Sequence, residues 1–320
     1  MEAILAQSFP PREILVVDDA STDDSVSVIQ SVIRKNPSVR LERNERNLGI
    51  LLTIQRWYAT LSGEYVFHAS ADDRVLPSFF QKSVALLARH PQAGFCSTLA
   101  LVVEPNGAEP RPYNTPTVCP RPGYLPPSKC REAYHRLGTW VVPHSVVYRR
   151  TAYLEAGGFN PELAANADNL IYRVLSAKHG SCYIPEPLML WRPSPDSFSR
   201  RATLDLGMTI KSVQRVEHEM RTTFGSIFSP EDIATMKRPA LSWALEDLLQ
   251  RPPGYDDDFL RMSRALGGGY WLDRPFRAAW RAHLLSGWLG LKIYHFLLQP
   301  GAERRRLLVR KLRGLMSGRA

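Results

Sequence analysis

The sequence lacks the features that mark secreted, metal-clustered or membrane-spanning proteins. None of its four cysteines forms a CxxC pair or a metal-ligand spacing, so we expect reduced thiols in a cytoplasmic protein: Cys96, Cys119, Cys130 and Cys182. The first residues contain no basic segment followed by an apolar run, and no signal peptide is expected. In the apolar stretch Phe276–Gln299, the longest uncharged run has ten residues. A bilayer span needs about 20.

Acidic residues are scarce at one end of the chain. Residues 261–320 contain 13 Lys/Arg against two acids, so this end contributes +11 to the net charge of +10 and the first 260 residues contribute about −1. We expect residues 276–320, which mix cationic and apolar positions, to lie on an anionic membrane surface, with the protein peripheral at the inner face. The alternative is a set of helices that cover the body with a solvated arginine face. No module of interleaved aromatic and basic residues appears, so no nucleic-acid partner is expected.

The chain as a whole has an ordinary globular composition, with 44% apolar and 22% charged residues. Short apolar runs alternate with segments of helical spacing, which predicts an α/β fold with a doubly wound sheet. The predicted strands are Ile14–Val17, Val39–Leu41, Tyr65–Ala69, Ser145–Tyr148 and an irregular or edge strand over 182–192. The predicted helices are 21–36, Ile50–Leu61, Pro77–His90 and 168–180, with Ser21 as the first N-cap and a long loop over 104–127.

Two of the predicted strands run directly into paired acids. Asp18 and Asp19 follow the first, and Asp72 and Asp73 follow the third. Ligands of doubly wound sheets bind at the carboxyl ends of the strands, so these acids are candidates for a ligand site. Asp18 and Asp19 suit a nucleobase or ribose, whereas Asp72 and Asp73 suit Mg²⁺ or Mn²⁺ with open positions for phosphate. Taken singly, each pair could also be a solvated loop or the start of a helix.

The motifs taken together resemble the family 2 glycosyltransferases of the GT-A fold. VVDDASTDDS, NERNLG and GEYVFHASADDRVLP occur in that order, followed by a GGF turn, an acid that opens a helix, and IPEPL before an arginine. The resemblance covers roughly residues 1–200. It implies a mixed, mostly parallel sheet with flanking helices over residues 1–203, followed by an α-helical region over 204–320.

The resemblance also implies roles for individual residues. Asp168 corresponds to the catalytic base, which would take the proton of the acceptor hydroxyl; a single base without a covalent intermediate implies inversion. Asp72 and Asp73 correspond to the metal-binding acids for Mg²⁺ or Mn²⁺. The nucleotide-sugar donor would be held by Asp18, Asp19, Asn47, Gly49, Ser70, Asp72 and Arg192.

Two departures from the family pattern stand out. Ser70 replaces the first acid of the DXD motif, so metal affinity would rest on Asp72 and Asp73. The chain also begins inside the helix that usually follows a first strand, so a central strand is missing; we expect a late start or a truncated copy. Loss of that strand would cost more than the stability margin of about 5–15 kcal/mol of a domain.

These observations predict an inverting, metal-dependent glycosyltransferase of cell-surface polysaccharide or glycolipid synthesis. Its donor would be a nucleotide-diphospho-sugar, and its acceptor a saccharide, a lipid-linked saccharide or a protein. Two alternatives stay open. One is a non-catalytic or degenerate GT-A protein that binds or scaffolds. The other is a sugar nucleotidyltransferase, which would need a glycine-rich loop after its first strand.

Overall fold

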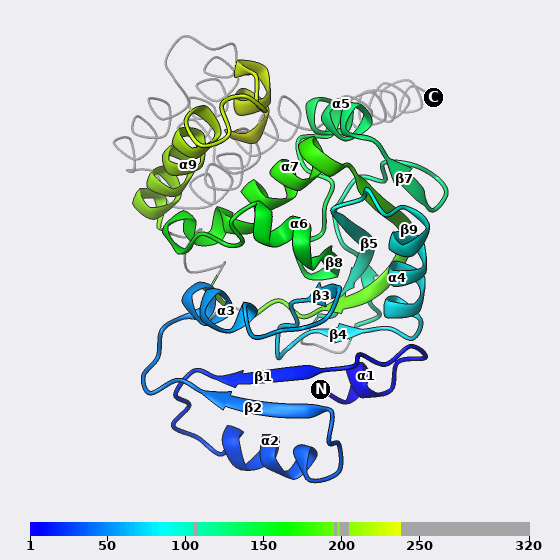
Figure 1. The fold of residues 1–320 in the computed structure, drawn as a ribbon, viewed down its shortest axis with the longest axis vertical. Helices are drawn as coiled ribbons and strands as arrows, with labels where there is room; N and C mark the ends of the chain where they lie inside the picture. Colours follow the sequence, from blue (N-terminus) through cyan, green and yellow to red (C-terminus); the bar gives the residue numbers. More distant parts are fainter. Residues whose placement is uncertain (105–107, 195–196, 199–204, 238–320) are drawn as a thin grey trace, which may run out of the picture. The chain divides into compact units, whose positions relative to one another are not determined.

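A computed structural model describes residues 1–104, 108–194, 197–198 and 205–237 (Figure 1). The chain divides into two compact units. The first comprises residues 1–131 and 140–198, and the second comprises 132–139 and 199–320. The predicted domain boundary at residue 203 falls outside the described residues and stays a prediction. The same holds for the membrane-facing role of residues 276–320. Among the described residues, no helix has the length and apolar character to cross a bilayer.

The first unit begins with a small parallel sheet. Its two strands are β1 (Ile14–Asp18) and β2 (Val39–Arg43), with Ile14 opposite Val39 and Asp18 opposite Arg43. The chain forms a short helix before β1, a crossover helix between the strands and a third helix after β2: α1 (Glu2–Leu5), α2 (Ser25–Ile33) and α3 (Ile50–Tyr58). The predicted strand–helix–strand order of this segment is confirmed.

The other strands of the first unit form a separate seven-stranded sheet of order β3-β8-β5-β9-β4, with β6 beside β5 and β7 beside β9. The sheet is mixed, as expected, but the prediction that it is mostly parallel is wrong, because the apolar runs of the sequence do not reveal the direction of their partner strands. Its β5–β9 pair is parallel, whereas its other pairs are antiparallel. The strand bounds are β3 (Tyr65–Phe67), β4 (Arg74–Val75), β5 (Phe95–Val102), β6 (Arg111–Pro112), β7 (Gly123–Leu125), β8 (Val146–Arg149) and β9 (Ser181–Trp191).

The strands β1 and β3 each have a single partner strand among the described residues. Among the described residues, β1 forms a ladder with β2 alone and β3 forms one with β8 alone. The strand β1 and the helix α2 are apolar but largely uncovered by other side chains. In β1, Leu15, Val16 and Val17 are half-buried, and α2 has no buried residue.

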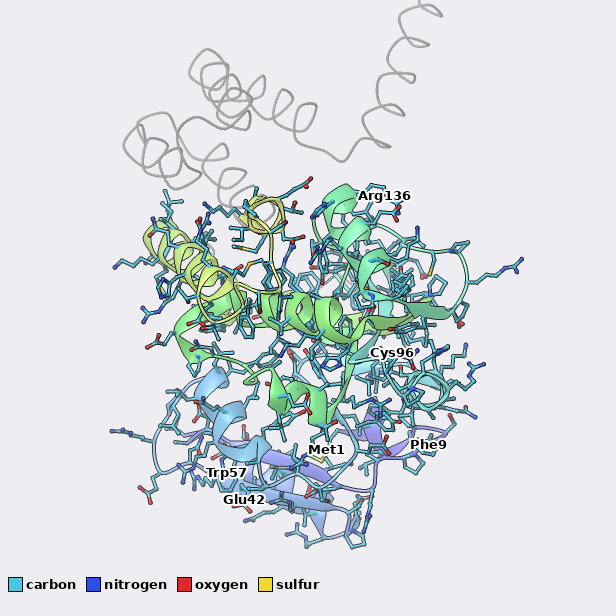
Figure 2. All side chains as sticks on the ribbon, turned by 45° about the horizontal axis from the view of Figure 1, so that its top comes forward. Met1, Phe9, Glu42, Trp57, Cys96 and Arg136 are labelled. Carbon is cyan, nitrogen blue, oxygen red and sulfur yellow. The ribbon has the colours of Figure 1, made fainter. Side chains whose placement is uncertain are left out.

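Helices cover the seven-stranded sheet and seal its core. The helix α4 (Phe79–Arg89) contacts β5, β8 and β9, and α6 (Arg150–Glu155) contacts β8 and α7 (Ala167–His179). A 3₁₀ segment, η2 (Pro161–Asn166), leads into α7. Cys96, with no exposed surface, lies in the interior (Figure 2). The core around it includes Val75, Phe79, Phe80, Leu86, Leu87, Val142, Val147, Ile184 and Met189.

The prolines of β9 have a local effect. The pairing with β5 shifts register between Thr98 and Ala100, so Ile184 is opposite Thr98 and Pro187 is opposite Leu99. A proline cannot donate to a ladder, and the strand accommodates it as an irregularity. The predicted irregular strand is therefore confirmed, but β9 is not an edge strand, since it pairs on both sides.

Two local predictions are wrong. Ser21 does not cap α2, which begins at Ser25 after Asp24; the Ser21 N–H instead lies 3.3 Å from both carboxylate oxygens of Asp18. The stretch 104–127 is also not one loop, because it contributes the short strands β6 and β7. Short strands are recognised by their partners and not by their own sequence, so periodicity could not reveal them.

In the second unit, the structure describes residues 132–139 and 205–237. The helix α5 (Pro127–Leu137) continues into it from the first unit, and α9 (Leu206–Arg221) begins with a cap in which the side chain of Asp205 accepts from the N–H of Met208 at 2.9 Å. The helix α9 agrees with the helical structure expected beyond residue 203.

Candidate active site

Four segments come together at one edge of the seven-stranded sheet. The register places the carboxyl ends of β3, β5 and β9 at the same edge as the start of β8. The loop 68–73 follows β3, Arg192 follows β9, and a 3₁₀ turn, η1 (Pro143–Ser145), precedes β8. The first turn of α7 carries Asp168. Sheet topology alone therefore gathers the predicted Ser70, Asp72, Asp73 and Arg192 at one edge.

Asp73 lies at the centre of this edge, and its side chain is only 2% exposed. Its Oδ1 accepts a hydrogen bond from the backbone N–H of Arg192 at 3.0 Å, and its Oδ2 lies 3.2 Å from Nδ1 of His144. The hydroxyl of Ser70 is 3.4 Å from the same ring nitrogen. Burial raises the pKa of Asp73; His144 and the Arg192 N–H counteract that effect, while the charge of Asp72 adds to it.

Asp168 occupies a site suited to a general base. Burial raises the pKa of its carboxyl to about 6, opposed by the N–H of Asn169, which donates to Oδ1 at 2.6 Å, and by the nearby His144. Its side chain nevertheless retains some solvent contact, since the residue is half-buried. A pKa near neutrality lets a carboxylate accept a proton efficiently at physiological pH. The position is the first turn of α7, where the helix dipole favours the ionised form.

Aromatic rings surround these acids. Tyr113 meets Trp191 edge to face with ring centroids 5.3 Å apart, and His144 stacks on Trp191 at 6.3 Å and 19°. Burial raises the pKa of Tyr113, and the negative charge of Asp168 adds to the shift, which places that ring close to the carboxylate. The acids therefore face a partly apolar wall that strengthens electrostatic interactions.

The other predicted residues form a second group, at the end of β1. Asp18 is buried and pairs with Arg43, whose Nε lies 2.9 Å from Oδ2. Asp19 accepts hydrogen bonds from the N–H groups of Leu48 at 2.9 Å and Gly49 at 2.8 Å. Gly49 has φ +79°, a conformation that favours glycine.

Asn44, the first residue of the NERNLG motif, completes this second group. It is buried and donates to Asp19 Oδ1 at 2.8 Å and to Thr53 Oγ1 at 2.9 Å, while Trp57 donates to its Oδ1 at 3.1 Å. The predicted Asn47 is exposed, and its Oδ1 accepts from the Gly49 N–H at 3.2 Å. Burial raises the pKa of Asp19, but the hydrogen bonds from Leu48, Asn44 and Gly49 outweigh it, so the pKa lies below its usual value.

The structure thus brings the predicted residues together in two groups rather than one. Among the described residues, no hydrogen bond or ion pair joins the Asp18 group to the Asp73 group. They are linked through packing, since α3, whose N-cap is Gly49, contacts η2 just before Asp168. Sequence reasoning missed His144, Tyr113 and Trp191; a lone histidine and scattered aromatics carry no readable spacing, and only the position of His144 directly before a strand offered a signal.

The carboxylates of Asp72 and Asp73 are ligands of the type that a hard divalent cation prefers. The described residues hold no group of three or more His, Cys, Asp or Glu side chains placed for a metal ion. Mg²⁺ and Mn²⁺ do not require such a cage, because they are commonly held by one or two carboxylates together with substrate phosphates and water. Asp72 is exposed, and none of the described residues forms a hydrogen bond or ion pair with its carboxylate. It could therefore supply such a ligand, and the predicted metal role of Asp73 stays a prediction.

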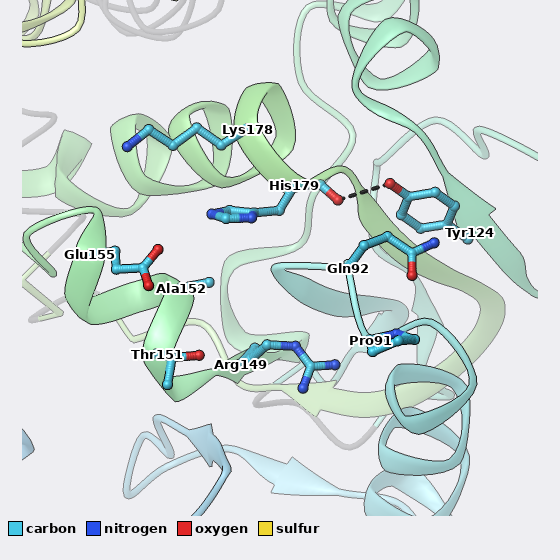
Figure 3. Close-up of a pocket in the computed structure, with 9 residues that line it drawn as sticks. All are labelled: Pro91, Gln92, Tyr124, Arg149, Thr151, Ala152, Glu155, Lys178 and His179. Carbon is cyan, nitrogen blue, oxygen red and sulfur yellow. Dashed lines mark hydrogen bonds between the residues drawn. The ribbon is translucent and has the colours of Figure 1, made fainter.

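A cavity of about 290 Å³ lies at the opposite edge of the sheet (Figure 3). Its lining includes Tyr124, Arg149, Glu155, Lys178 and His179. These residues come from the start of the β3–β8 pairing and the end of α7, far along each element from the candidate site. Arg149 is held by carbonyl groups and Glu64, so its charge is already used within the protein.

Residues 1–155 match the model of the family described as Glycosyl transferase family 2. An uncharacterized glycosyltransferase of Haemophilus influenzae is 28% identical over 32% of this chain and 32% of its own length. The amylovoran biosynthesis glycosyltransferase AmsE of Erwinia amylovora is 22% identical over 63% of this chain and 72% of its own. The matched region spans a minor part of the first curated relatives, from 23% to 39% of their length.

Solved structures share the fold. TarS 1–349 of S. aureus in complex with UDP-GlcNAc is 14% identical and aligns with a TM-score of 0.54 over 92% of this chain and 84% of that one. The mannosyltransferase PcManGT of Pyrobaculum calidifontis, in complex with GDP-Man and Mn²⁺, is 16% identical with a TM-score of 0.50 over 92% and 79%. With its mixed sheet and flanking helices, the described chain has the GT-A fold. Its residues 1–155, slightly less than half of the chain, are similar to glycosyltransferase family 2.

Proposed function

We propose that the protein is an inverting, metal-dependent glycosyltransferase that moves a sugar from a nucleotide-diphosphate donor to a hydroxyl group. The observation that carries the proposal is the environment of Asp168, whose pKa burial raises to about 6 against the opposing effect of the nearby His144. A carboxylate of this kind can remove the proton of an acceptor hydroxyl while the hydroxyl oxygen attacks the anomeric carbon.

In this proposal the second group holds the donor. Asp18, Asp19, Asn47 and Gly49 shape the loop that would meet the nucleotide, and Ser70, Asp72 and Arg192 would face its diphosphate and sugar. A bound Mg²⁺ or Mn²⁺ would neutralise the charge that develops on the leaving diphosphate. Support comes from the two neighbours of known structure, which were solved with UDP-GlcNAc and with GDP-Man and Mn²⁺.

The acceptor class follows less directly. We propose a saccharide, lipid-linked or protein hydroxyl in cell-surface polysaccharide or glycolipid synthesis, supported by the similarity to an amylovoran biosynthesis glycosyltransferase. Placement at the inner face of a membrane, through residues 276–320, is part of the same proposal and rests on their charge and apolar content.

The test is a thermal shift of the full chain with UDP, GDP, dTDP and CDP, each with and without Mn²⁺. We expect one nucleotide to raise the melting temperature only with Mn²⁺, and the shift to vanish in Asp72→Ala. The exposed Asp23→Ala serves as a control and should behave like the wild type. A cooperative melt that no nucleotide shifts would contradict the proposal and favour a non-catalytic binding protein.

A further inference from the structure

The cavity shown in Figure 3 lies apart from the candidate active site. Its volume of about 290 Å³ is close to the lower limit of pockets that bind small molecules, roughly 300–1,000 Å³. The last turn of α7 contributes Lys178 and His179 to its lining. Asp168 precedes His179 by eleven positions in the same helix, which at about 1.5 Å per residue corresponds to roughly 16 Å. A small ligand in the cavity would therefore not reach the candidate base.

Three polar side chains of the cavity wall have no partner within the protein. Thr151 and Glu155 belong to α6 and Lys178 belongs to α7, two helices that contact each other. All three residues are exposed, and in the part of the chain that the structure describes none of their side chains forms a hydrogen bond or an ion pair. A hydroxyl both donates and accepts, a carboxylate accepts and an ammonium donates. The wall thus offers unused donors and acceptors side by side.

The lining of the cavity carries no net charge. The ammonium of Lys178 and the carboxylate of Glu155 cancel, and Arg149 pairs with Glu64, whose Oε1 lies 2.8 Å from Nη1. Burial lowers the pKa of His179, so its ring is neutral at pH 7. An anionic ligand would be attracted by Lys178 but repelled by Glu155. An uncharged ligand therefore fits this lining best.

The rest of the wall is largely apolar. Pro91 and Ala152 present only carbon atoms, and the Tyr124 hydroxyl is already used, since it donates to the carbonyl of His179 at 3.0 Å. The ring of Tyr124 stacks on His90, with centroids 5.4 Å apart and 17° between the planes. A saccharide matches such a wall, because its ring has a rim of hydroxyl groups and faces formed by C–H bonds. Apolar side chains pack against these faces while a few polar groups fix the orientation.

We propose that this cavity is a second saccharide site, which binds one uncharged sugar unit through Thr151, Glu155 and Lys178. The carboxylate of Glu155 accepts from sugar hydroxyls, the ammonium of Lys178 donates to them, and the hydroxyl of Thr151 does either. The sugar is bound here without reaction, because the candidate base lies at the other end of α7. The inference goes beyond the proposed function and does not rest on it, since the cavity would bind a sugar whether or not the protein transfers one.

The test uses the full chain without nucleotide or metal. The probes are glucose, galactose, mannose and N-acetylglucosamine; saturation-transfer NMR detects binding, and a titration gives the Kd of each sugar. Thr151→Val removes the hydroxyl at nearly constant shape, and Glu155→Gln removes the charge. Thr22→Val and Glu45→Gln are the matched controls, since both residues are exposed and neither lines the cavity. Backbone amide signals of the wild type, recorded with the same sugars, give a readout that needs no variant.

We expect at least one of the sugars to bind, and Thr151→Val and Glu155→Gln each to raise its Kd about threefold to tenfold, the loss that one hydrogen bond typically causes. Both controls should bind it like the wild type. In the wild type, the sugar should shift the amide signals of residues 151–155 and 178–180 and leave those of 166–169 unchanged.

The inference is wrong if none of the sugars binds. It is also wrong if the sugar shifts the signals around Asp168 and both cavity variants bind it like the wild type, which would place the sugar in the candidate active site. Binding of inorganic phosphate in place of the sugars, lost in Lys178→Met, would overturn it too, since the cavity would then select an anion. A nucleotide shift in the thermal assay without any sugar binding would leave the proposed function intact and remove this second site alone.

Discussion

The carboxylate of Asp19 accepts the backbone N–H of Gly49 at 2.8 Å, across 30 residues of sequence. The same side chain accepts from Leu48, and from Asn44, which is itself tied to Thr53 and Trp57. The acid that the family resemblance assigns to the nucleotide is therefore also the anchor of the loop 44–49. A variant of Asp19 that fails to bind nucleotide would not by itself show direct contact.

Replacing Asp19 by alanine should lower the free energy of unfolding by about 1–3 kcal/mol, because two backbone N–H groups lose their acceptor. Since the pKa of Asp19 is below its usual value in the folded protein, this contribution is present above the unfolded pKa and is lost as the pH falls through the folded pKa. Urea unfolding at pH 7 and at pH 3 measures both effects. Asp24→Ala, whose side chain makes no cap hydrogen bond, is the control and should cost much less.

Asp168→Asn should reduce the transfer rate by about 100-fold or more, because the variant has no general base. In the wild type, kcat/KM should rise with pH and level off above about 6, as the carboxylate loses its proton. The measurement is a pH–rate profile with the donor that the thermal shifts identify. A wild-type profile that is flat between pH 5 and 8 would contradict the assignment of Asp168 as the base.

The same residue should lower stability at neutral pH. Its folded pKa is raised above the unfolded value, so ionisation disfavours folding above about pH 6, and this penalty disappears as the pH falls toward 4. At pH 8, the free energy of unfolding of Asp168→Asn should therefore be about 1 kcal/mol higher than that of the wild type. At pH 4.5 this difference should be smaller. Equal unfolding midpoints at both pH values would show that the carboxylate is better solvated than its surroundings indicate.

Gly180 ends the helix that carries Asp168, and alanine should not fit there. Its φ is +67°, and a Cβ would lie 2.7 Å from the Tyr124 hydroxyl and closer still to the Leu125 carbonyl oxygen. Gly180→Ala should cost more than about 3 kcal/mol, because both the clash and the conformation are unfavourable. Gly157, with φ +84° and no atom within 4 Å of the position that a Cβ would take, is the matched control; its alanine variant should cost about 1 kcal/mol. Thermal unfolding of the two variants compares them directly.

Amide hydrogen exchange should be faster in the small β1–β2 sheet of the first unit than in its seven-stranded sheet. The β1 strand has one ladder and half-buried side chains, whereas β5 pairs with β8 and β9 and begins with four buried residues. Amides of Leu15 to Val17 should exchange well before those of Cys96 to Thr98. Equal protection of the two strands would mean that β1 is covered better than its ladder indicates.

The sequence predicted those parts of the fold that repeat a local pattern. β1, β2 and the helix α2 between them follow from apolar spacing, and the acids after β1 and β3 follow from the ends of those strands. Ser21 was misplaced as a cap because serine and aspartate compete for the same backbone groups at a helix start.

The site was less accessible to prediction. Asp72 and Asp73 are the same residue type side by side, and nothing in that pair of letters tells which one is buried. The distinction comes from Arg192 and His144, which lie 119 and 71 positions farther along the chain from Asp73. Long-range partners of this kind have no local signal, so periodicity and motif spacing could place the acids but not assign their contacts.

At the far edge of the seven-stranded sheet, the charge of Arg149 is used in contacts within the protein. The edge that carries the acids, in contrast, has an exposed acid, Asp72. The guanidinium of Arg149 donates to the carbonyl groups of Ala93 and Leu87 and to Glu64, and it lies over the ring of Tyr65. Protein engineering can make use of this difference between the two edges of the sheet. Stabilising substitutions introduced around that far edge should leave the proposed sugar transfer unaffected, whereas donor or acceptor preference should be altered by changing the loops that carry Ser70 and Arg192.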